Sequence, residues 1–238
     1  VAELIFACSL SMVHLSRRSE GIINWSSQEW AVLKLPQSFC TGSPLMPHKK
    51  NPDVPELIRG KSGRTIGTLA GFLATVKSLP LAYNKDLQED KEAMFDTVDT
   101  TTASLAIMAK MWKGTTFDTA RAAKLATGGN LSATYLAEVL VKKGLPFREA
   151  HHKVGAMVKL AEERNITLEE LDPTDLKVGL GLGPGDDSFK DTTRLADIMN
   201  TIGAPSTTMV KKTLATENNR LGRLNSEISQ RRDRQNRP

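Results

Sequence analysis

One short stretch of the chain, residues 41–53, concentrates side chains that could do acid–base chemistry. It carries a hydroxyl on Ser43 and ammonium groups on Lys49 and Lys50. A carboxamide on Asn51 follows, and Gly and Pro residues fix two turns around these groups. Loops that hold several polar groups on a rigid frame are frequent sites of binding and catalysis. From composition alone an exposed connection with some lysines is an equal alternative, and the residues that follow the loop favour a functional role.

A helix is predicted to follow the 41–53 loop directly, from Pro52 to about Leu79. Asn51 is a good N-cap residue, and Pro is favoured at the first helical position. Helical spacing relates the apolar residues Val54, Leu57, Ile58, Ile66, Leu69, Ala70, Leu73 and Val76. Room for a neighbouring helix is left by Gly60, Gly63, Gly67 and Gly71. The positive end of such a helix, with Lys49 and Lys50, makes an anion site that suits a carboxylate-bearing substrate.

Three runs of residues resemble one protein family. The run Gly42–Pro52 resembles the signature loop of the fumarase/aspartase superfamily, written G-S-x-x-M-P-x-K-x-N-P, and has every fixed position. The run Tyr83–Glu92 is similar to the Y-N-[KR]-D-L-Q-E-D-K-E segment of argininosuccinate lyases and delta-crystallins, and Leu140–His151 also resembles that subfamily. The resemblance covers about residues 1–210. It implies an all-α fold, a long-helix bundle of the fumarase/aspartase type followed by a small helical C-terminal domain.

The activity that this resemblance implies is argininosuccinate lyase, a carbon–nitrogen lyase of arginine biosynthesis that cleaves argininosuccinate reversibly to arginine and fumarate. This β-elimination removes a proton from a carbon beside a carboxylate, and the resulting dianion needs preorganised positive charge. Ser43 matches the family's catalytic base, so nearby cations and loop amides must stabilise its alkoxide form. Lys49 and Asn51 match the groups that hold the dianion. Glu56 matches the carboxylate that pairs with a histidine on the acid side of the reaction.

The same resemblance assigns substrate contacts to the 83–92 segment. Tyr83, Gln88 and Lys91 match positions that bind the substrate in argininosuccinate lyases. A phenol, a carboxamide and an ammonium group can together grip the amino-acid carboxylate of the arginine moiety. The acids of this segment are interpreted as a solvated loop: Asp86, Glu89 and Asp90.

The resemblance also implies an assembly, a homotetramer whose active sites are each shared between three subunits. The family's general-acid histidine and its other substrate loops lie upstream of the matched segment. Because the chain begins with Val1 in the middle of a helical pattern, we expect it to be the C-terminal part of a longer protein and to be inactive alone. Two alternatives remain: a non-catalytic structural protein of the delta-crystallin type, or another lyase of the superfamily such as adenylosuccinate lyase.

The remaining polar residues indicate neither a metal site nor a cofactor. No metal-ligand spacing is evident, and no cofactor is expected. His14 lies in an apolar helical run and is expected to be a hydrogen-bonded core or interface residue. Cys8 and Cys40 have no local partner, which indicates a reduced, cytoplasmic protein. No apolar stretch is long enough to span a membrane.

Composition shifts divide the 238 residues into three parts. The expected parts are the end of the helical bundle at 1–113, a small helical domain at 114–210 and a basic, frayed tail at 211–238. Within them, helical patterns are predicted at about 1–19, 52–79, 91–112, 117–126, 131–143, 147–164 and 167–171. The formal net charge is +5, but the excess is concentrated in the tail without aromatic residues between the arginines. This argues against a nucleic-acid partner.

Overall fold

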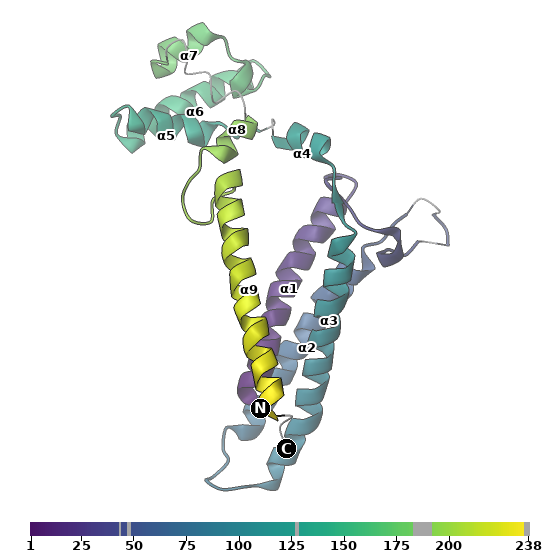
Figure 1. The fold of residues 1–238 in the computed structure, drawn as a ribbon. Coiled ribbons are helices and arrows are strands. Elements are labelled where there is room, and N and C mark those ends of the chain that lie inside the picture. Colours follow the sequence, from purple (N-terminus) through teal and green to yellow (C-terminus); the bar gives the residue numbers. More distant parts are fainter. Residues whose placement is uncertain (43, 47–48, 127–128, 183–191, 236–238) are drawn as a thin grey trace. The chain divides into compact units, whose positions relative to one another are not determined.

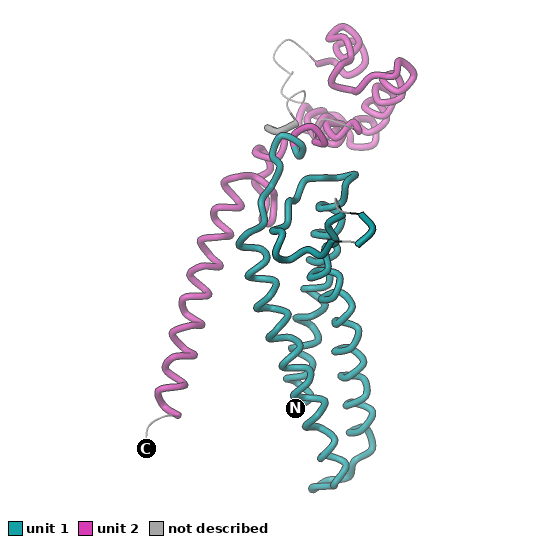
Figure 2. The backbone as a smooth tube through the Cα atoms, turned by 90° about the vertical axis from the view of Figure 1, so that its right-hand side faces the viewer, with its two compact units in different colours: residues 1–122 teal, residues 123–238 magenta. Residues whose placement is uncertain are grey.

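The computed structural model describes residues 1–42, 44–46, 49–126, 129–182 and 192–235. The chain divides into two compact units, residues 1–122 and residues 123–238 (Figure 2). In the described residues no helix is both long enough and apolar enough to cross a bilayer. The predicted all-α architecture is confirmed, since helices make up nearly all of the regular structure.

Three long helices form the first unit: α1 (Ala2–Ser26), α2 (Asp53–Val76) and α3 (Asp90–Lys113). They lie side by side, and each contacts the other two (Figure 1). One apolar cluster of the unit consists of Met12, Ile22, Leu33, Ile58, Met108 and Met111, and Ile5 and Phe72 are also buried. These helices match the predicted long-helix bundle.

The packed face of α2 carries small polar residues beside the apolar Ile58 and Phe72. Ser62 and Thr65 are buried on it, and the Ser9 hydroxyl of α1 donates to the Thr65 carbonyl oxygen at 2.9 Å. The larger apolar residues Leu57, Ile66 and Leu73 are exposed in this chain. A Cβ added at Gly60, Gly63, Gly67 or Gly71 would meet nothing within 4 Å. The glycine ridge that was expected to seat a neighbouring helix therefore faces away from α1 and α3.

Both ends of the connection between α1 and α2 differ from prediction. α1 continues to Ser26 instead of ending near Ser19, because buried Ile22 packs in the core and offsets the roughly 1 kcal/mol cost of Gly21 in a helix. α2 begins at Asp53, with Pro52 as a cap residue that makes no side-chain capping bond.

A two-residue ladder ties the ends of α1 and α3 together. β1 (Leu33–Lys34) pairs antiparallel with β2 (Thr116–Phe117), so that Leu33 lies opposite Phe117. Lys34 Nζ lies 2.8 Å from a carboxylate oxygen of Asp118, whose pKa is lowered mainly by that hydrogen bond. A 3₁₀ turn, η1 (Gln37–Phe39), then leads into the 41–53 loop. These contacts hold the start of the loop against the bundle.

The second unit is built from helices that are shorter than those of the first unit, except for the last one. They are α5 (Ala133–Lys142), α6 (Phe147–Glu163), the 3₁₀ turn η3 (Leu168–Glu170), α7 (Pro173–Leu180), α8 (Thr192–Asp197) and α9 (Thr207–Gln235). The buried residues of its core include Leu136, Leu140, Ala150, Val154, Ala161, Leu168, Leu171, Leu176 and Leu180. Helix α4 (Thr119–Ala126) runs across the division between the units. The short helices predicted between residues 117 and 171 are confirmed within a few residues.

Helix α9 occupies the region expected as a frayed basic tail. It is a continuous helix of 29 residues, and none of them is buried. Apolar residues recur along it at intervals of three, four or seven, at Val210, Leu214, Leu221, Leu224 and Ile228, and all five are exposed. Good helix formers and an Arg220–Glu217 ion pair one turn apart favour the helix over a disordered tail.

Candidate active site

The base of the 41–53 loop is closed by backbone hydrogen bonds. Thr41 and Asn51 form an isolated antiparallel bridge, in which the Asn51 N–H donates to the Thr41 carbonyl oxygen at 2.8 Å. The Thr41 N–H donates back to the Asn51 carbonyl oxygen at 3.3 Å. Inside the loop, the Lys49 N–H donates to the Met46 carbonyl oxygen at 3.0 Å. The two ends of the loop are thereby held together at the entrance to α2.

The Asp53 carboxylate forms a second clamp at the same place. One of its oxygens accepts from the Thr41 backbone N–H at 2.8 Å and from the Thr41 hydroxyl at 2.5 Å. The Thr41 hydroxyl bond is the largest cause that lowers the pKa of Asp53 below its usual value. Because Asp53 also opens α2, the clamp fixes the loop to the first turn of that helix.

The expected chemistry-bearing residues of this loop lie around that base. Lys49 is exposed, Asn51 is half-buried in the bridge, and Glu56 is exposed in the first turn of α2. Asn51 was predicted as the N-cap of α2. The structure places it in the bridge with Thr41 instead, because its backbone is committed to the loop base. Ser43, the predicted catalytic base, lies outside the described residues.

A cavity of about 240 Å³ lies beside the loop base. Lys50 and Pro52 line it from the loop, Cys40 from the residue before Thr41, and Lys34 from β1. Burial is the largest cause that raises the pKa of the Cys40 thiol. The neighbouring Asp53 carboxylate also raises this pKa, whereas Lys50 lowers it. The Cys40 thiol is therefore kept neutral. Lys50 gives the cavity a positive charge, whereas the charge of Lys34 is balanced by Asp118.

The 83–92 segment begins a separate group of polar residues. The side chains of Tyr83 and Gln88 are exposed, the latter on the 3₁₀ turn η2 (Lys85–Glu89). Lys91 Nζ lies 2.5 Å from a carboxylate oxygen of Asp90. Asp90 is buried, with 7% of its surface exposed, so the interpretation of this acid as part of a solvated loop was wrong. Asp90 is the first residue of α3, and its carboxylate forms an ion pair with Lys91.

The structure does not bring the two groups of predicted residues together within one chain. The 41–53 loop adjoins the first residue of α2, and the 83–92 segment follows the last residue of that helix at the other end (Figure 1). A helix of 24 residues is about 36 Å long at 1.5 Å per residue. Lys49 and Gln88 of the same copy are thus too far apart to contact one small molecule.

The Thr41–Asp53 clamp was missed by sequence reasoning. Asp53 was assigned only to the first turn of the helix, where acids favour the helix dipole. The available signal was a hydroxyl residue immediately before the glycine of the loop and an acid immediately after its last proline. Such a pair at both ends of a loop is suited to close it.

Comparison with known proteins agrees with these features. The sequence model of a family described as "Argininosuccinate lyase C-terminal" matches residues 130–203, and one described as "Lyase" matches residues 1–67. The argininosuccinate lyase of Nitratidesulfovibrio vulgaris strain Hildenborough is 52% identical over 177 residues, which is 74% of this chain and 38% of that protein. That of Legionella pneumophila strain Paris is 52% identical over 171 residues, 72% of this chain and 42% of that protein. The chain thus spans about two fifths of the length of these curated relatives.

Solved structures share the fold at lower sequence identity. EDDS lyase in complex with formate superposes with a TM-score of 0.80 at 23% identity, covering 97% of this chain and 48% of that one. A class II fumarase from Schistosoma mansoni gives a TM-score of 0.70 at 17% identity, covering 84% and 40%. The relatives at about 50% identity, the matched family models and the complete 41–53 and 83–92 motifs all indicate the same family. The chain belongs to the argininosuccinate lyase and delta-crystallin subfamily of the fumarase/aspartase superfamily.

Proposed function

We propose that this chain supplies the signature-loop part of an argininosuccinate lyase. The observation that carries the proposal is the pairing of a complete 41–53 loop with a complete 83–92 segment, which distinguishes argininosuccinate lyases and delta-crystallins from the other lyases of the superfamily. The loop base supports it, because Thr41, Asn51 and Asp53 hold the ends of the loop in one arrangement. A preorganised loop is what electrostatic stabilisation of a developing dianion requires.

In the proposed reaction, Ser43 removes a proton from the carbon beside one carboxylate of the succinate moiety. The electron pair of the broken C–H bond moves into that carboxylate and forms a dianion, which Lys49 and Asn51 stabilise. The bond between the neighbouring carbon and the guanidino nitrogen then breaks, and the electron pair returns to form the double bond of fumarate. The leaving nitrogen takes a proton from the acid side of the site, where Glu56 pairs with a histidine.

The 83–92 segment is proposed to bind the arginine part of the substrate. Tyr83, Gln88 and Lys91 would grip its amino-acid carboxylate. Because α2 separates this segment from the 41–53 loop by about 36 Å, one site must combine the loop of one copy with the 83–92 segment of another. On the family resemblance we further propose a homotetramer with sites shared between three subunits, acting in the cytoplasm without nucleic-acid or membrane partners. The 238-residue chain alone would be inactive.

A chimera tests the assignment. The part of the N. vulgaris enzyme that this chain does not span is joined to the chain, and fumarate release is followed by ultraviolet absorbance. We expect fumarate from argininosuccinate and none from malate or adenylosuccinate. Release from adenylosuccinate instead would assign a different lyase of the superfamily. A folded chimera with no activity on any of the three substrates would favour a structural protein of the delta-crystallin type.

The base assignment is tested by Ser43→Ala in the same chimera. Loss of the base should lower kcat by about 10³-fold or more and leave KM within a few-fold, because the serine acts only in the transition state. Pro44→Ser is the matched control, since it changes a variable position of the same loop and should retain activity. If Ser43→Ala kept most of kcat, Ser43 would not be the base.

A further inference from the structure

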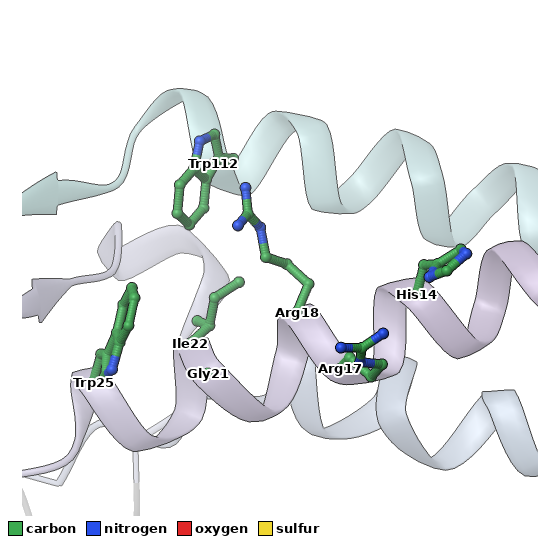
Figure 3. Close-up of a pocket in the computed structure, with 7 residues that line it drawn as sticks. All are labelled: His14, Arg17, Arg18, Gly21, Ile22, Trp25 and Trp112. Atoms are coloured by element: carbon green, nitrogen blue, oxygen red, sulfur yellow. The ribbon is translucent and has the colours of Figure 1, made fainter. Parts of the chain in front are cut away.

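The outward face of α1 near α3 carries a cavity whose chemistry the proposed lyase reaction does not use. Its volume is about 480 Å³, within the range of small-molecule sites. The residues that line it from α1 are His14, Arg17, Arg18, Gly21, Ile22 and Trp25, and Trp112 closes it from α3 (Figure 3). We call it the Arg–Trp cavity. His14 is exposed at the edge of this cavity, so it is not a core residue, and its role at an interface stays a prediction.

The Arg–Trp cavity has an uncompensated positive charge. Arg17 and Arg18 are permanently charged, and none of the lining residues is an acid. In the part of the chain that the structure describes, neither arginine has a hydrogen bond or an ion pair with a carboxylate. Glu20, the nearest acid on α1, forms an ion pair with Arg59 of α2 instead. Two guanidinium groups are thus free to bind an anion.

The aromatic side chains add a flat apolar surface to this charge. The guanidinium carbon of Arg18 lies 4.7 Å from the centre of the Trp112 ring, a cation–π contact that holds its orientation. Trp25 is 45% exposed on the same helix face, and Ile22 adds an aliphatic side chain to the lining (Figure 3). A planar group can therefore lie against indole surface while its charged substituent reaches the arginines.

Gly21 keeps the cavity open. It lies on the helix face between Arg18 and Trp25, and a Cβ added there would meet nothing within 4 Å. A larger side chain at this position would enter the cavity without disturbing the packed side of α1. Gly21 is thus a position where the cavity can be filled while the helix is kept.

We propose that the Arg–Trp cavity binds a small anion that carries a flat apolar group, either an aromatic carboxylate or an aromatic phosphate monoester. The guanidinium groups bind the anionic oxygens with charge-assisted hydrogen bonds, and the indoles stack on the ring. This site goes beyond the lyase reaction and does not depend on it, since none of its residues belongs to the proposed active site.

The test uses tryptophan fluorescence of the 238-residue chain, because Trp25 and Trp112 are two of its three tryptophans. The chain is titrated with phenyl phosphate and with benzoate, excited at the red edge of indole absorption where neither probe absorbs. Saturable quenching is expected with at least one of them, and the tighter probe assigns the anionic group. Inorganic phosphate has the anionic group without a ring, and benzyl alcohol has the ring without an anionic group. Each should therefore bind at least about tenfold more weakly. Trp30→Phe should retain the quenching.

Variants locate the binding. Gly21→Leu should abolish saturable quenching, whereas its matched control Gly21→Ala should keep the affinity within about twofold. Arg17→Gln, an exposed change that leaves the core intact, should weaken binding about tenfold. Circular dichroism verifies that each variant keeps its helices.

The proposal is overturned if neither aromatic anion saturates, if benzyl alcohol binds equally well, or if folded Arg17→Gln keeps full affinity. It is also overturned if another copy of the chain covers the cavity and excludes both probes.

Discussion

At the scale of single residues, the Thr41–Asp53 clamp holds the two ends of the 41–53 loop together. One Asp53 oxygen accepts two hydrogen bonds from Thr41, while the backbone bridge to Asn51 lies beside it. Hydrogen bonds to an ionised carboxylate are stronger than bonds between neutral groups. The clamp thus places a charge-assisted contact where the loop meets α2, next to the residues proposed to hold the dianion.

The clamp should open in acid. The folded pKa of Asp53 is lowered, chiefly by the Thr41 hydroxyl, so its contribution is complete above the unfolded pKa of about 4. That contribution is lost as pH falls through the folded pKa. We expect the hydrogen-exchange protection of the Thr41 amide to fall over this acidic range. In Asp53→Ala, protection should be about tenfold lower at neutral pH and independent of pH in that range.

Thr41→Val separates the two bonds of the clamp. Valine keeps the backbone N–H and the branched shape but removes the hydroxyl, so protection should lie between that of the unmodified chain and Asp53→Ala. Equal protection in all three chains at neutral pH would mean that the backbone bridge alone closes the loop.

At the scale of elements, Gly114 controls how α3 meets the segment before the 41–53 loop. It follows the last residue of α3, and its N–H caps the helix by donating to the Met111 carbonyl oxygen at 3.1 Å. A Cβ added at Gly114 would lie 2.8 Å from Cγ of Pro36. A proline ring cannot swing away as a flexible side chain can, so the backbone would have to move.

Gly114→Ala should therefore destabilise the first unit by about 1–3 kcal/mol. The same substitution at Gly21, inside α1 and with open space around it, should stabilise by about 0.5–1 kcal/mol. Urea unfolding of the two variants measures both effects in one chain. Similar stabilities would show that the Pro36 segment yields at little cost.

Much of the helical architecture could be predicted from sequence, but not which faces the helices bury. Helical spacing with Gly and Pro punctuation predicts α2 and α3 to within a few residues. It does not predict that Ser62 and Thr65 lie in the packed face of α2 while Leu57 and Leu73 are exposed, because a pattern with apolar residues on several sides has no unique inner face. The two-residue strands β1 and β2 are too short to leave a periodic signal.

The candidate site shows the same limit. The residue types and their motifs could be read from the chain, since each motif is continuous in sequence. Their separation also follows from the helix predicted at about 52–79 between them, whereas the burial of individual residues does not. Asp90 was misread for a related reason: an acid in a charged run gives no sign that it is buried against Lys91 until the start of α3 is placed.

At the scale of the whole molecule, the length of α2 requires more than one copy for each proposed active site. The loop and the 83–92 segment lie at opposite ends of that helix, about 36 Å apart. In a closed symmetric assembly, antiparallel helices of different copies can bring opposite ends together. The exposed glycine ridge and the exposed Leu57, Ile66 and Leu73 of α2 leave a surface where such helices can approach.

A shared site predicts that two inactive variants restore each other. In the chimera, Ser43→Ala lacks the base and Gln88→Ala lacks a substrate contact, so each alone should have little activity. The two variants are unfolded together in equal amounts and then refolded. If a site takes its loop from one copy and its 83–92 segment from another, about one quarter of the sites have both parts intact. We expect activity to recover toward that fraction. Mixing the variants after separate refolding, without subunit exchange, is the control and should restore none. The co-refolded chains could instead form tetramers and stay inactive. Both motifs of a site would then have to come from one copy, which the 24-residue helix between them does not allow. In that case the assignment of Gln88 to the substrate would have to be abandoned.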